Sequence, residues 1–218
     1  MNTHGQLAGK CALVTGSGTG IGREIALEFA RQGADLVLHH AHSGAGAESA
    51  AAESRLLGRR AAVIQADFDD LDAVAELARQ ANEFLGRIDC LVNNAGITFN
   101  KPFCEVTREQ FDRLYHVNVR APYFLTQQVA RQMLALGGGA VCNITSIHGL
   151  SGAPEHSVYA GTKGAIIAQT RSLAVELAHR GVRVNAIAPG WVTVENYYRA
   201  IPGFNEDDAR QAAADKVP

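Results

Sequence analysis

Two residues in the second half of the chain have the types and the spacing to carry out proton chemistry. Tyr159 and Lys163 open a segment with helical periodicity, and residues four apart project from the same face of a helix. A fixed ammonium beside a phenol stabilises the phenolate and lowers the phenol's pKa from its ordinary value of about 10. A downward shift of roughly three units would let Tyr159 exchange protons near neutral pH. Alone, the pair is better explained as a buried tyrosine and a solvated lysine on an amphipathic helix, so the catalytic interpretation depends on the other motifs of the chain.

A glycine-rich turn near the N-terminus could bind the phosphates of a dinucleotide. The apolar run 11–15 ends in Gly16-Ser17-Gly18-Thr19-Gly20-Ile21-Gly22, and a helical pattern follows. Glycines allow a tight turn and a close approach of the pyrophosphate, which the free N–H groups of a helix N-terminus attract. A glycine cluster by itself could be a plain turn, but its place between strand and helix favours a cofactor site.

The rest of the chain alternates between short apolar runs and helical patterns. The expected further strands are 35–40, 61–66, 88–92, 140–144 and 182–188, and the expected further helices are 45–57, 71–85, 111–133 and 159–178. Pro122 should disturb the long helix 111–133. Continuous apolar strands separated by helices predict a parallel sheet covered on both faces, that is, an α/β fold with a doubly wound sheet. Residues 1–218 are expected to form a single domain.

The composition excludes some classes of partner. The chain has 218 residues, 47% of them hydrophobic and 19% charged, with a net charge of −2. This charge argues against a nucleic-acid-binding surface, and no apolar run approaches the roughly 20 residues of a membrane span. We expect a small-molecule substrate and no nucleic-acid or membrane partner. The four cysteines show no C-x-x-C pairing, and a reducing, cytoplasmic setting fits them best.

Polar and glycine residues follow the ends of the expected strands. Asp67 follows the third, Asn94 the fourth, Ser146 the fifth and Pro189-Gly190 the sixth, and in a parallel sheet these ends share one edge. Over residues 8–195 the chain resembles the short-chain dehydrogenase/reductase family, including its sugar and polyol dehydrogenases and its 3-oxoacyl-(acyl-carrier-protein) reductases. The motifs that carry this resemblance are Thr15 to Gly22, Asn93-Asn94-Ala95-Gly96, Asn118, Ser146, Tyr159-x-x-x-Lys163 and Pro189-Gly190.

The resemblance implies a Rossmann-like fold, an NAD(P)-dependent oxidoreductase and four catalytic residues. Tyr159 would be the general acid in carbonyl reduction and the base in alcohol oxidation. Lys163 would lower the pKa of Tyr159 and hydrogen-bond the nicotinamide ribose. Ser146 would hydrogen-bond the substrate oxygen, and Asn118 would hold a water that links Lys163 to solvent. Outside this pattern, Ser146 could be a cap and Asn118 a buried amide that satisfies backbone groups.

The resemblance also implies a set of cofactor-binding residues. Asp67 would contact the adenine, unless it caps a helix, and Asn94 would line the ribose, whereas Asn93 is expected to be structural. Val192 could offer its backbone to the carboxamide, because Val194 stands where the family usually has a threonine and Thr193 comes one place early. The full expected set is Gly16, Ser17, Thr19, Gly20, Ile21, Gly22, His40, His42, Ser43, Asp67, Phe68, Asn94, Ala95, Gly96, Tyr159, Lys163, Pro189, Gly190 and Val192.

The end of the second strand bears on the choice of cofactor. It reads Leu38-His39-His40-Ala41-His42-Ser43 and lacks the acid that usually holds the ribose hydroxyls of NAD. A 2′-phosphate could be bound by His42, Ser43 and Arg23, so the sequence favours NADP. The absence of Arg or Lys directly after the strand leaves NAD open, and the histidines could simply face solvent. No metal site is expected, because His39 and His40 should point to opposite faces of a strand.

Three further expectations concern the outer parts of the fold. The chain stops before the family's usual last helix and strand, which would leave the sixth strand as a bare edge. Residues 191–218 are expected to form a substrate lid that includes Tyr197, Tyr198, Ile201, Pro202 and Phe204. The helices 111–133 and 159–178 are the family's usual dimerisation surface, so a homodimer or homotetramer is expected.

The substrate is less determined than the chemistry. His148, Glu155 and His156 precede Tyr159 and could line a pocket for a polyhydroxylated substrate, although each could instead be a surface residue. The run Ser146-Ile147-His148 is similar to that of the family's sugar dehydrogenases, which favours a sugar or polyol. The alternative enzyme is a 3-oxoacyl-thioester reductase, for whose acidic carrier Arg131 and Arg171 are isolated candidates. From another class, the chain could be a non-catalytic NADP-binding sensor or scaffold.

Overall fold

The computed structural model describes residues 5–194, 203, 205–207 and 210–211 and contains one six-stranded parallel sheet. The strand order is β3-β2-β1-β4-β5-β6. The chain therefore builds outward from β1 to β3, returns to the centre at β4 and builds outward again. This is the doubly wound, Rossmann-like α/β fold that the sequence predicts. The strands are β1 (Cys11–Val14), β2 (Asp35–His40), β3 (Ala61–Gln65), β4 (Cys90–Asn93), β5 (Gly139–Ile144) and β6 (Val182–Ile187).

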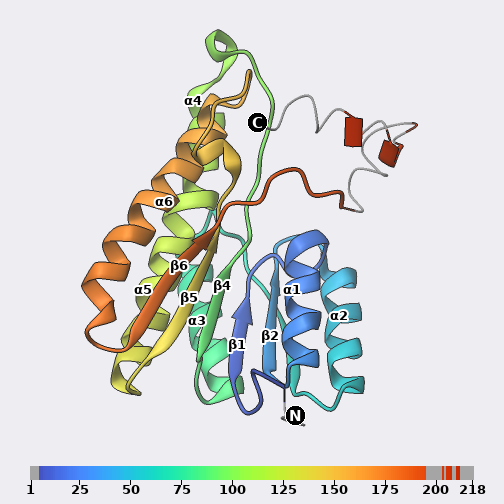
Figure 1. Ribbon diagram of the computed structural model, residues 1–218, viewed down its shortest axis with the longest axis vertical. Coiled ribbons are helices and arrows are strands. Elements are labelled where there is room, and N and C mark those ends of the chain that lie inside the picture. Colours follow the sequence, from blue (N-terminus) through green and yellow to red (C-terminus); the bar gives the residue numbers. More distant parts are fainter. Residues whose placement is uncertain (1–4, 195–202, 204, 208–209, 212–218) are drawn as a thin grey trace.

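Helices cover the two faces of the sheet in separate groups (Figure 1). α1 (Gly20–Arg31) and α2 (Gly44–Leu56) pack on one face, and α3 (Leu71–Leu85), α5 (Ala121–Ala135) and α6 (Ser157–Ala178) pack on the other. Along the central strands, alternate side chains enter the two cores: Val14 packs with the α1 side and Leu13 with the α3 side. Because both faces of these strands are buried, the sequences of β1 and β4 are apolar at every position except Asn93.

The predicted long helix 111–133 is present with the disturbance that Pro122 predicts, since the structure has three consecutive helical pieces there. They are α4 (Arg108–Tyr115), the π-helical turn η2 (His116–Arg120) and α5. Pro122 lies in the first turn of α5 and has no N–H to donate to the carbonyl of Asn118, four residues earlier. The wide turn before Pro122 accommodates this break and contains Asn118.

The start of α4 has a local cause that the periodicity did not reveal. Thr107 Oγ1 accepts a hydrogen bond from the Gln110 N–H at 3.3 Å, and Gln110 Oε1 accepts one from the Thr107 N–H at 3.1 Å. This reciprocal pair is a capping box, which satisfies two of the backbone donors that a helix start leaves unpaired. The helix therefore begins at Arg108, three residues before the predicted 111.

Within the part of the chain that the structure describes, β3 and β6 are the two outer strands of the sheet. In β6, Val182 and Val184 are buried, whereas Arg183 and Asn185 are exposed, so the described residues cover only one face of this strand. The lid residues Tyr197, Tyr198, Ile201, Pro202 and Phe204 lie outside the described residues. Among the described helices, none is both long and apolar enough to span a bilayer.

Candidate active site

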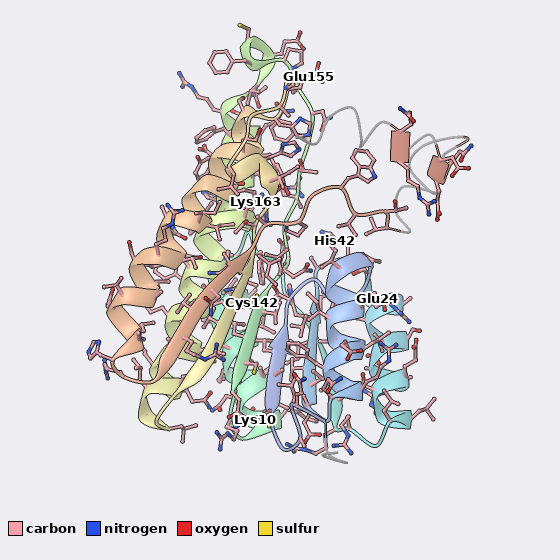
Figure 2. All side chains as sticks on the ribbon, in the orientation of Figure 1. Lys10, Glu24, His42, Cys142, Glu155 and Lys163 are labelled. Atoms are coloured by element: carbon pink, nitrogen blue, oxygen red, sulfur yellow. The ribbon has the colours of Figure 1, made fainter. Side chains whose placement is uncertain are left out.

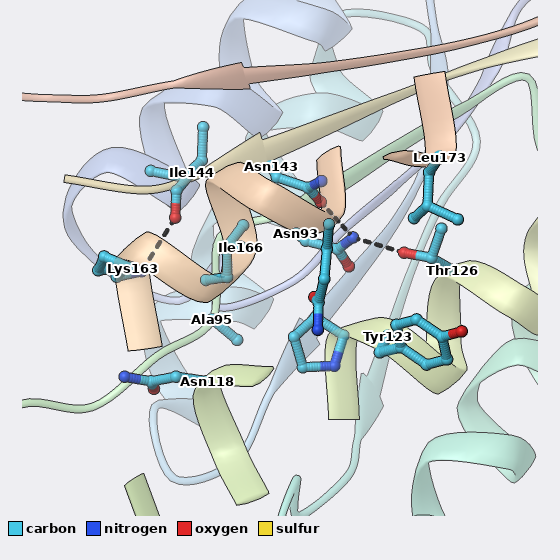
Figure 3. A pocket seen from close by; sticks show the side chains of 12 residues that line it. Asn93, Ala95, Asn118, Tyr123, Thr126, Asn143, Ile144, Lys163, Ile166 and Leu173 are labelled. Atoms are coloured by element: carbon cyan, nitrogen blue, oxygen red, sulfur yellow. Dashed lines mark hydrogen bonds between the residues drawn. The ribbon is translucent and has the colours of Figure 1, made fainter. Parts of the chain in front are cut away.

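Tyr159 and Lys163 lie in the first turns of α6, next to the carboxyl end of β5. The Lys163 ammonium donates a hydrogen bond to the Ile144 carbonyl at 2.9 Å and lies 5.5 Å from the centre of the Tyr159 ring. Figure 3 marks this hydrogen bond between Lys163 and Ile144 with a dashed line. Lys163 is only 5% exposed, and this removal from water lowers its pKa to about 8. The lysine can therefore gain or lose a proton close to neutral pH.

Asn118 projects from the π-helical turn toward the same place. Its Oδ1 accepts from the Ile97 N–H at 2.8 Å, and its Nδ2 donates to the Ile97 carbonyl at 2.9 Å and to Thr162 Oγ1 at 3.2 Å. The amide is 1% exposed. These bonds connect η2, the segment after β4 and α6. The sequence analysis did not identify Thr162, which lies next to Lys163.

Ser146 stands between β5 and the 3₁₀ turn η3 (Ile147–Gly149). Its Oγ accepts a hydrogen bond from the His148 N–H at 3.2 Å, and the residue is buried. A hydroxyl that accepts in this way keeps its own proton for donation to another oxygen. The geometry is compatible both with the expected cap and with the expected contact to a substrate oxygen.

Lys163 lines a small cavity of about 20 Å³, whose lining side chains are drawn in Figure 3. It is large enough for about one water molecule, and Asn118, Lys163 and Asn93 contribute to its lining. Asn93 Nδ2 donates to Thr126 Oγ1 and Asn143 Oδ1, both at 2.8 Å, while its buried Oδ1 has no protein partner. Asn93 is thus a core residue, as expected, and its carbonyl oxygen adds an acceptor to the cavity wall.

The glycine turn is held in shape by a second asparagine. Gly16 and Gly20 have φ values of +63° and +55°, a region in which side chains other than glycine are strained. A Cβ on Gly22 would clash with the Asn94 side chain and the Gly16 carbonyl. Asn94 Nδ2 donates to the carbonyls of Thr15 and Gly16 at 3.0 and 3.1 Å. The side-chain amide of Asn94 therefore supports the turn, and the same residue was expected to line a ribose.

The residues of this turn fit a dinucleotide pyrophosphate. Thr19 is the N-cap of α1 but makes no side-chain cap, and the first turn of α1 has no acidic residue. Its backbone N–H groups therefore remain suited to an anion. A Cβ on Gly18 would clash with Ser43, so the start of α2 lies directly against the glycine turn.

His39 proves to be a structural residue, whereas the sequence left it open as a solvent-facing one. It is 1% exposed, its Nδ1 accepts from the Gly16 N–H at 3.2 Å and its Nε2 donates to the Ala66 carbonyl at 3.0 Å. Its ring stacks on Phe68 at 4.5 Å between ring centres. Burial lowers the pKa of His39 to about 4, so the ring is neutral and ties β1, β2 and β3 together.

The neighbouring histidines divide between core and surface. His40 is 9% exposed, so it does not face solvent either. Its Nδ1 is buried without a protein partner, and its ring lies beneath Gly44, the first residue of α2. His42 is exposed.

Comparison with known proteins identifies the family. The family model described as short chain dehydrogenase matches residues 10–200. The chain belongs to this family. It is therefore an NAD(P)-dependent oxidoreductase. The fold and the recognition from sequence are both confirmed.

Individual relatives of this short-chain dehydrogenase carry several names. A hydroxynaphthalene reductase-like protein of Metarhizium anisopliae is 42% identical over 88% of this chain and 71% of its own length. A short chain dehydrogenase of Burkholderia cenocepacia in complex with NADP is 38% identical, with a TM-score of 0.83 over 87% of this chain and 77% of its own. A 7α-hydroxysteroid dehydrogenase complexed with NADH and 7-oxo glycochenodeoxycholic acid is 35% identical, with a TM-score of 0.86 over 94% and 78%.

The remaining cofactor candidates of this short-chain dehydrogenase lie around the same edge of the sheet. Asp67 is exposed and does not cap α3, because Asp70 is the cap and accepts from the Asp72 N–H at 2.8 Å. Phe68 is buried against His39, so only its backbone could reach a cofactor.

The segments after β4 and β6 complete this edge. A Cβ on Gly96 would lie 3.1 Å from Asn118 Oδ1, so the glycine lets this segment pass close to the catalytic candidates. The Pro189 carbonyl accepts from the Ile147 N–H at 3.0 Å, which ties the end of β6 to η3. Val194 packs against Gly20, and a Cβ on that glycine would lie 3.1 Å from it. Of the other candidates in these segments, Ala95 is half-buried, and Gly190 and Val192 are exposed.

The sequence analysis missed Thr15 as a supporting residue of this edge. It is fully buried, and its Oγ1 accepts from the N–H groups of Asn94 and Ala95, both at 3.0 Å. This hydroxyl joins the glycine turn to the segment after β4. The threonine was visible within the glycine motif, but its role depends on the side-by-side pairing of β1 and β4.

Proposed function

We propose that this enzyme interconverts a secondary alcohol and a ketone, with Tyr159 as the general acid/base. The observation that carries the proposal is the buried Lys163 ammonium, 5.5 Å from the centre of the Tyr159 ring. A positive charge with little water around it favours the phenolate of a neighbouring tyrosine and lowers its pKa. A bound nicotinamide cofactor supplies or accepts the hydride, and Tyr159 gives or takes the matching proton.

Ser146 and Asn118 have supporting roles in this proposal. The Ser146 hydroxyl donates to the substrate oxygen and stabilises the charge that develops there. A water in the 20 Å³ cavity connects Lys163 to Asn118 and re-supplies the proton. Because the Asn118 side chain is bonded to Ile97 and Thr162, its backbone carbonyl, which Pro122 cannot pair, is the acceptor that we assign to this water.

We also propose NADP as the preferred cofactor. No acid stands at the end of β2 to repel a 2′-phosphate, and the N-terminus of α2 has neither a side-chain cap nor an acid in its first turn. The buried Nδ1 of His40 and the half-buried Ser43 lie beside that helix start. Arg23 supports the proposal less than the sequence implied, because its guanidinium pairs with Glu24 and Glu53. We expect kcat/KM to be at least about tenfold higher with NADPH than with NADH.

For the substrate we propose a sugar, a polyol or a related polyhydroxylated molecule. Polar side chains that could bond such a molecule, His148 and His156, have their rings within 6.4 Å of the Tyr159 ring centre to centre. The test is a screen of cofactor oxidation and reduction with sugars, polyols, hydroxylated aromatic ketones and 3-oxoacyl thioesters. Turnover of only the thioesters would favour the rival reductase, and cofactor binding without any turnover would favour a sensor.

We further propose that the enzyme works as a homodimer or homotetramer in the cytoplasm. Support for assembly comes from the apolar side chains exposed on α4, α5 and α6, which are Phe111, Tyr123, Phe124 and Val175. Support for a reducing compartment comes from the free Cys11, Cys90 and Cys142, which lie on strands. Burial raises the pKa of each of these thiols, which makes them poor nucleophiles.

A further inference from the structure

Two histidines form a pair beside Tyr159. The ring centres of His148 and His156 are 4.8 Å apart, and they lie 6.2 and 6.4 Å from the centre of the Tyr159 ring. Both rings are half-buried, so the pair is neither core packing nor a freely solvated surface. No described group of three possible ligands could make this pair a metal site.

The backbone around the pair fixes it relative to the proposed catalytic groups. His148 lies in η3, and its N–H donates to Ser146 Oγ at 3.2 Å. His156 immediately precedes α6 and lies three residues before Tyr159. The residue before it, Glu155, has a φ of +63° and accepts a hydrogen bond from the Lys101 N–H at 3.0 Å. A non-glycine residue held in this left-handed conformation often marks a functional site; Figure 2 labels Glu155 near the start of α6.

The hydrogen bonds define what the rings can offer to a ligand. His156 Nδ1 lies 2.7 Å from the Pro154 carbonyl, and since a carbonyl only accepts, Nδ1 carries a proton and donates it. The neutral ring then presents Nε2 as an acceptor. Loss of water and the neighbouring His156 lower the pKa of His148, which favours its neutral ring. A ring that donates through one nitrogen and accepts through the other suits an uncharged hydroxyl, which both donates and accepts, better than a carboxylate or phosphate, which only accepts.

We propose that His148 and His156 form a hydroxyl-binding subsite, and that the substrate is a ketone with a hydroxyl on the carbon next to the carbonyl, or the matching vicinal diol. This inference rests on the proposed function, because it takes the reacting oxygen to lie at Tyr159 and Ser146. With that oxygen in place, the adjacent carbon carries its hydroxyl toward the histidine pair. The pair thereby selects hydroxyketones over simple ketones.

The test compares a matched pair of ketones, 2-hydroxycyclohexanone and cyclohexanone, with the full chain and NADPH. We expect wild-type kcat/KM to favour the hydroxyketone by at least about tenfold, as befits a site built to bond a hydroxyl. His148→Phe and His156→Phe keep an aromatic ring but remove its hydrogen bonds, and each should lower this ratio to about threefold or less. His179→Phe, at the exposed far end of α6, is the control and should keep the wild-type ratio.

A second measurement covers the case in which the variants fold poorly. Cyclohexane-1,2-diol and cyclohexanol are compared as competitive inhibitors of the wild-type enzyme, and the diol should bind about tenfold more tightly. Equal ratios for wild type and both variants, or a wild type that treats the two ketones and the two alcohols alike, would overturn the subsite but leave the proposed function standing. A wild type that turns over another substrate of the screen but neither of these ketones would also overturn the subsite and leave the proposed function standing, whereas cofactor binding with no turnover of any substrate would overturn both.

Discussion

At the scale of single residues, the burial of Lys163 lowers the stability of the fold and places an ammonium group beside Tyr159. Lys163 is held in a nearly dry position by one hydrogen bond to the Ile144 carbonyl. Its pKa falls from 10.5 to about 8, which means that folding disfavours its charged form. Between these two values the unfolded chain carries a proton that the folded chain has lost, so the free energy of unfolding rises with pH across this window.

Lys163→Met should therefore stabilise the cofactor-free protein at pH 7 while abolishing turnover. The gain has an upper limit of about 3 kcal/mol, the free energy that corresponds to the pKa shift, less the lost bond to Ile144. Urea unfolding at pH 7 and pH 10 measures it, and the difference between variant and wild type should shrink at the higher pH. A variant that is less stable than wild type at pH 7 would contradict the expected cost of burying this charge.

His39 gives stability the same direction of pH dependence as Lys163, in a more acidic window. Its pKa is lowered from 6.5 to about 4, because a protonated ring would be buried and could no longer accept from the Gly16 N–H. In the unfolded chain His39 binds a proton below pH 6.5, whereas in the folded chain it does so only below about pH 4. This group's contribution is full above pH 6.5 and declines by about 3 kcal/mol as the pH falls through that window.

His39→Gln should flatten the acid side of the stability profile and lower the stability at pH 7. Unfolding free energies at pH 7, 5.5 and 4.5 measure both effects. The matched control is His42→Gln, since His42 is exposed, and this variant should follow the wild-type profile. A steep acid loss that persists in His39→Gln would show that another group controls it.

At the scale of elements, the start of α4 illustrates how a short helix is defined. Eight residues are too few for a helix to be stable alone, so its N-terminal cap and its packing must hold it. Thr107→Ala removes the capping hydroxyl and should cost about 1 kcal/mol of unfolding free energy. Thr98→Ala, in an exposed loop position, should change stability by less than about 0.5 kcal/mol. Equal effects of the two substitutions in chemical unfolding would show that the capping box contributes nothing.

The elements differ in how well the sequence predicts them. β2 and α3 begin and end at the predicted residues, Asp35–His40 and Leu71–Leu85, because the buried positions of each element repeat without interruption. The helix around Pro122 could not be predicted from period alone, because α4 and α5 are both amphipathic and the π-helical turn between them shifts the phase. Pro122 signalled a disturbance there, but its form depends on Asn118 being held by Ile97 and Thr162.

At the scale of the whole molecule, the apolar surface of α4, α5 and α6 bears on assembly. Val175 is 81% exposed on a helix that packs against the sheet on its other side, and Phe111, Tyr123 and Phe124 are also exposed. Light scattering should give at least twice the 23.2 kDa of one chain. Val175→Asp should shift the mass toward the monomer, whereas Leu56→Asp, at an 88% exposed position of α2, should not. A wild-type monomer at micromolar concentration would rule out this interface.

The sequence predicts which residues meet at the candidate site but not which hydrogen bonds they make there. The order of Gly16, Asn94, Ser146 and Tyr159 along alternating strands and helices is enough to bring them to one edge, because parallel strands end together. Which partner each side chain takes depends on strand pairing and register. Asn94 hydrogen-bonds the glycine turn, and His39 bridges Gly16 to Ala66. Both contacts exist because β1 lies between β2 and β4, and the hydrophobic period of the sequence does not specify this strand order.

The most direct test of the account is the Tyr159→Phe variant, assayed for both cofactor binding and turnover. We expect the dissociation constant for NADPH to change by less than about threefold, while kcat for ketone reduction falls by at least 10²-fold, the usual contribution of a positioned proton donor. Such a split would assign the proton transfer to the Tyr159 hydroxyl. Turnover comparable to wild type, with the cofactor bound normally, would contradict the central claim.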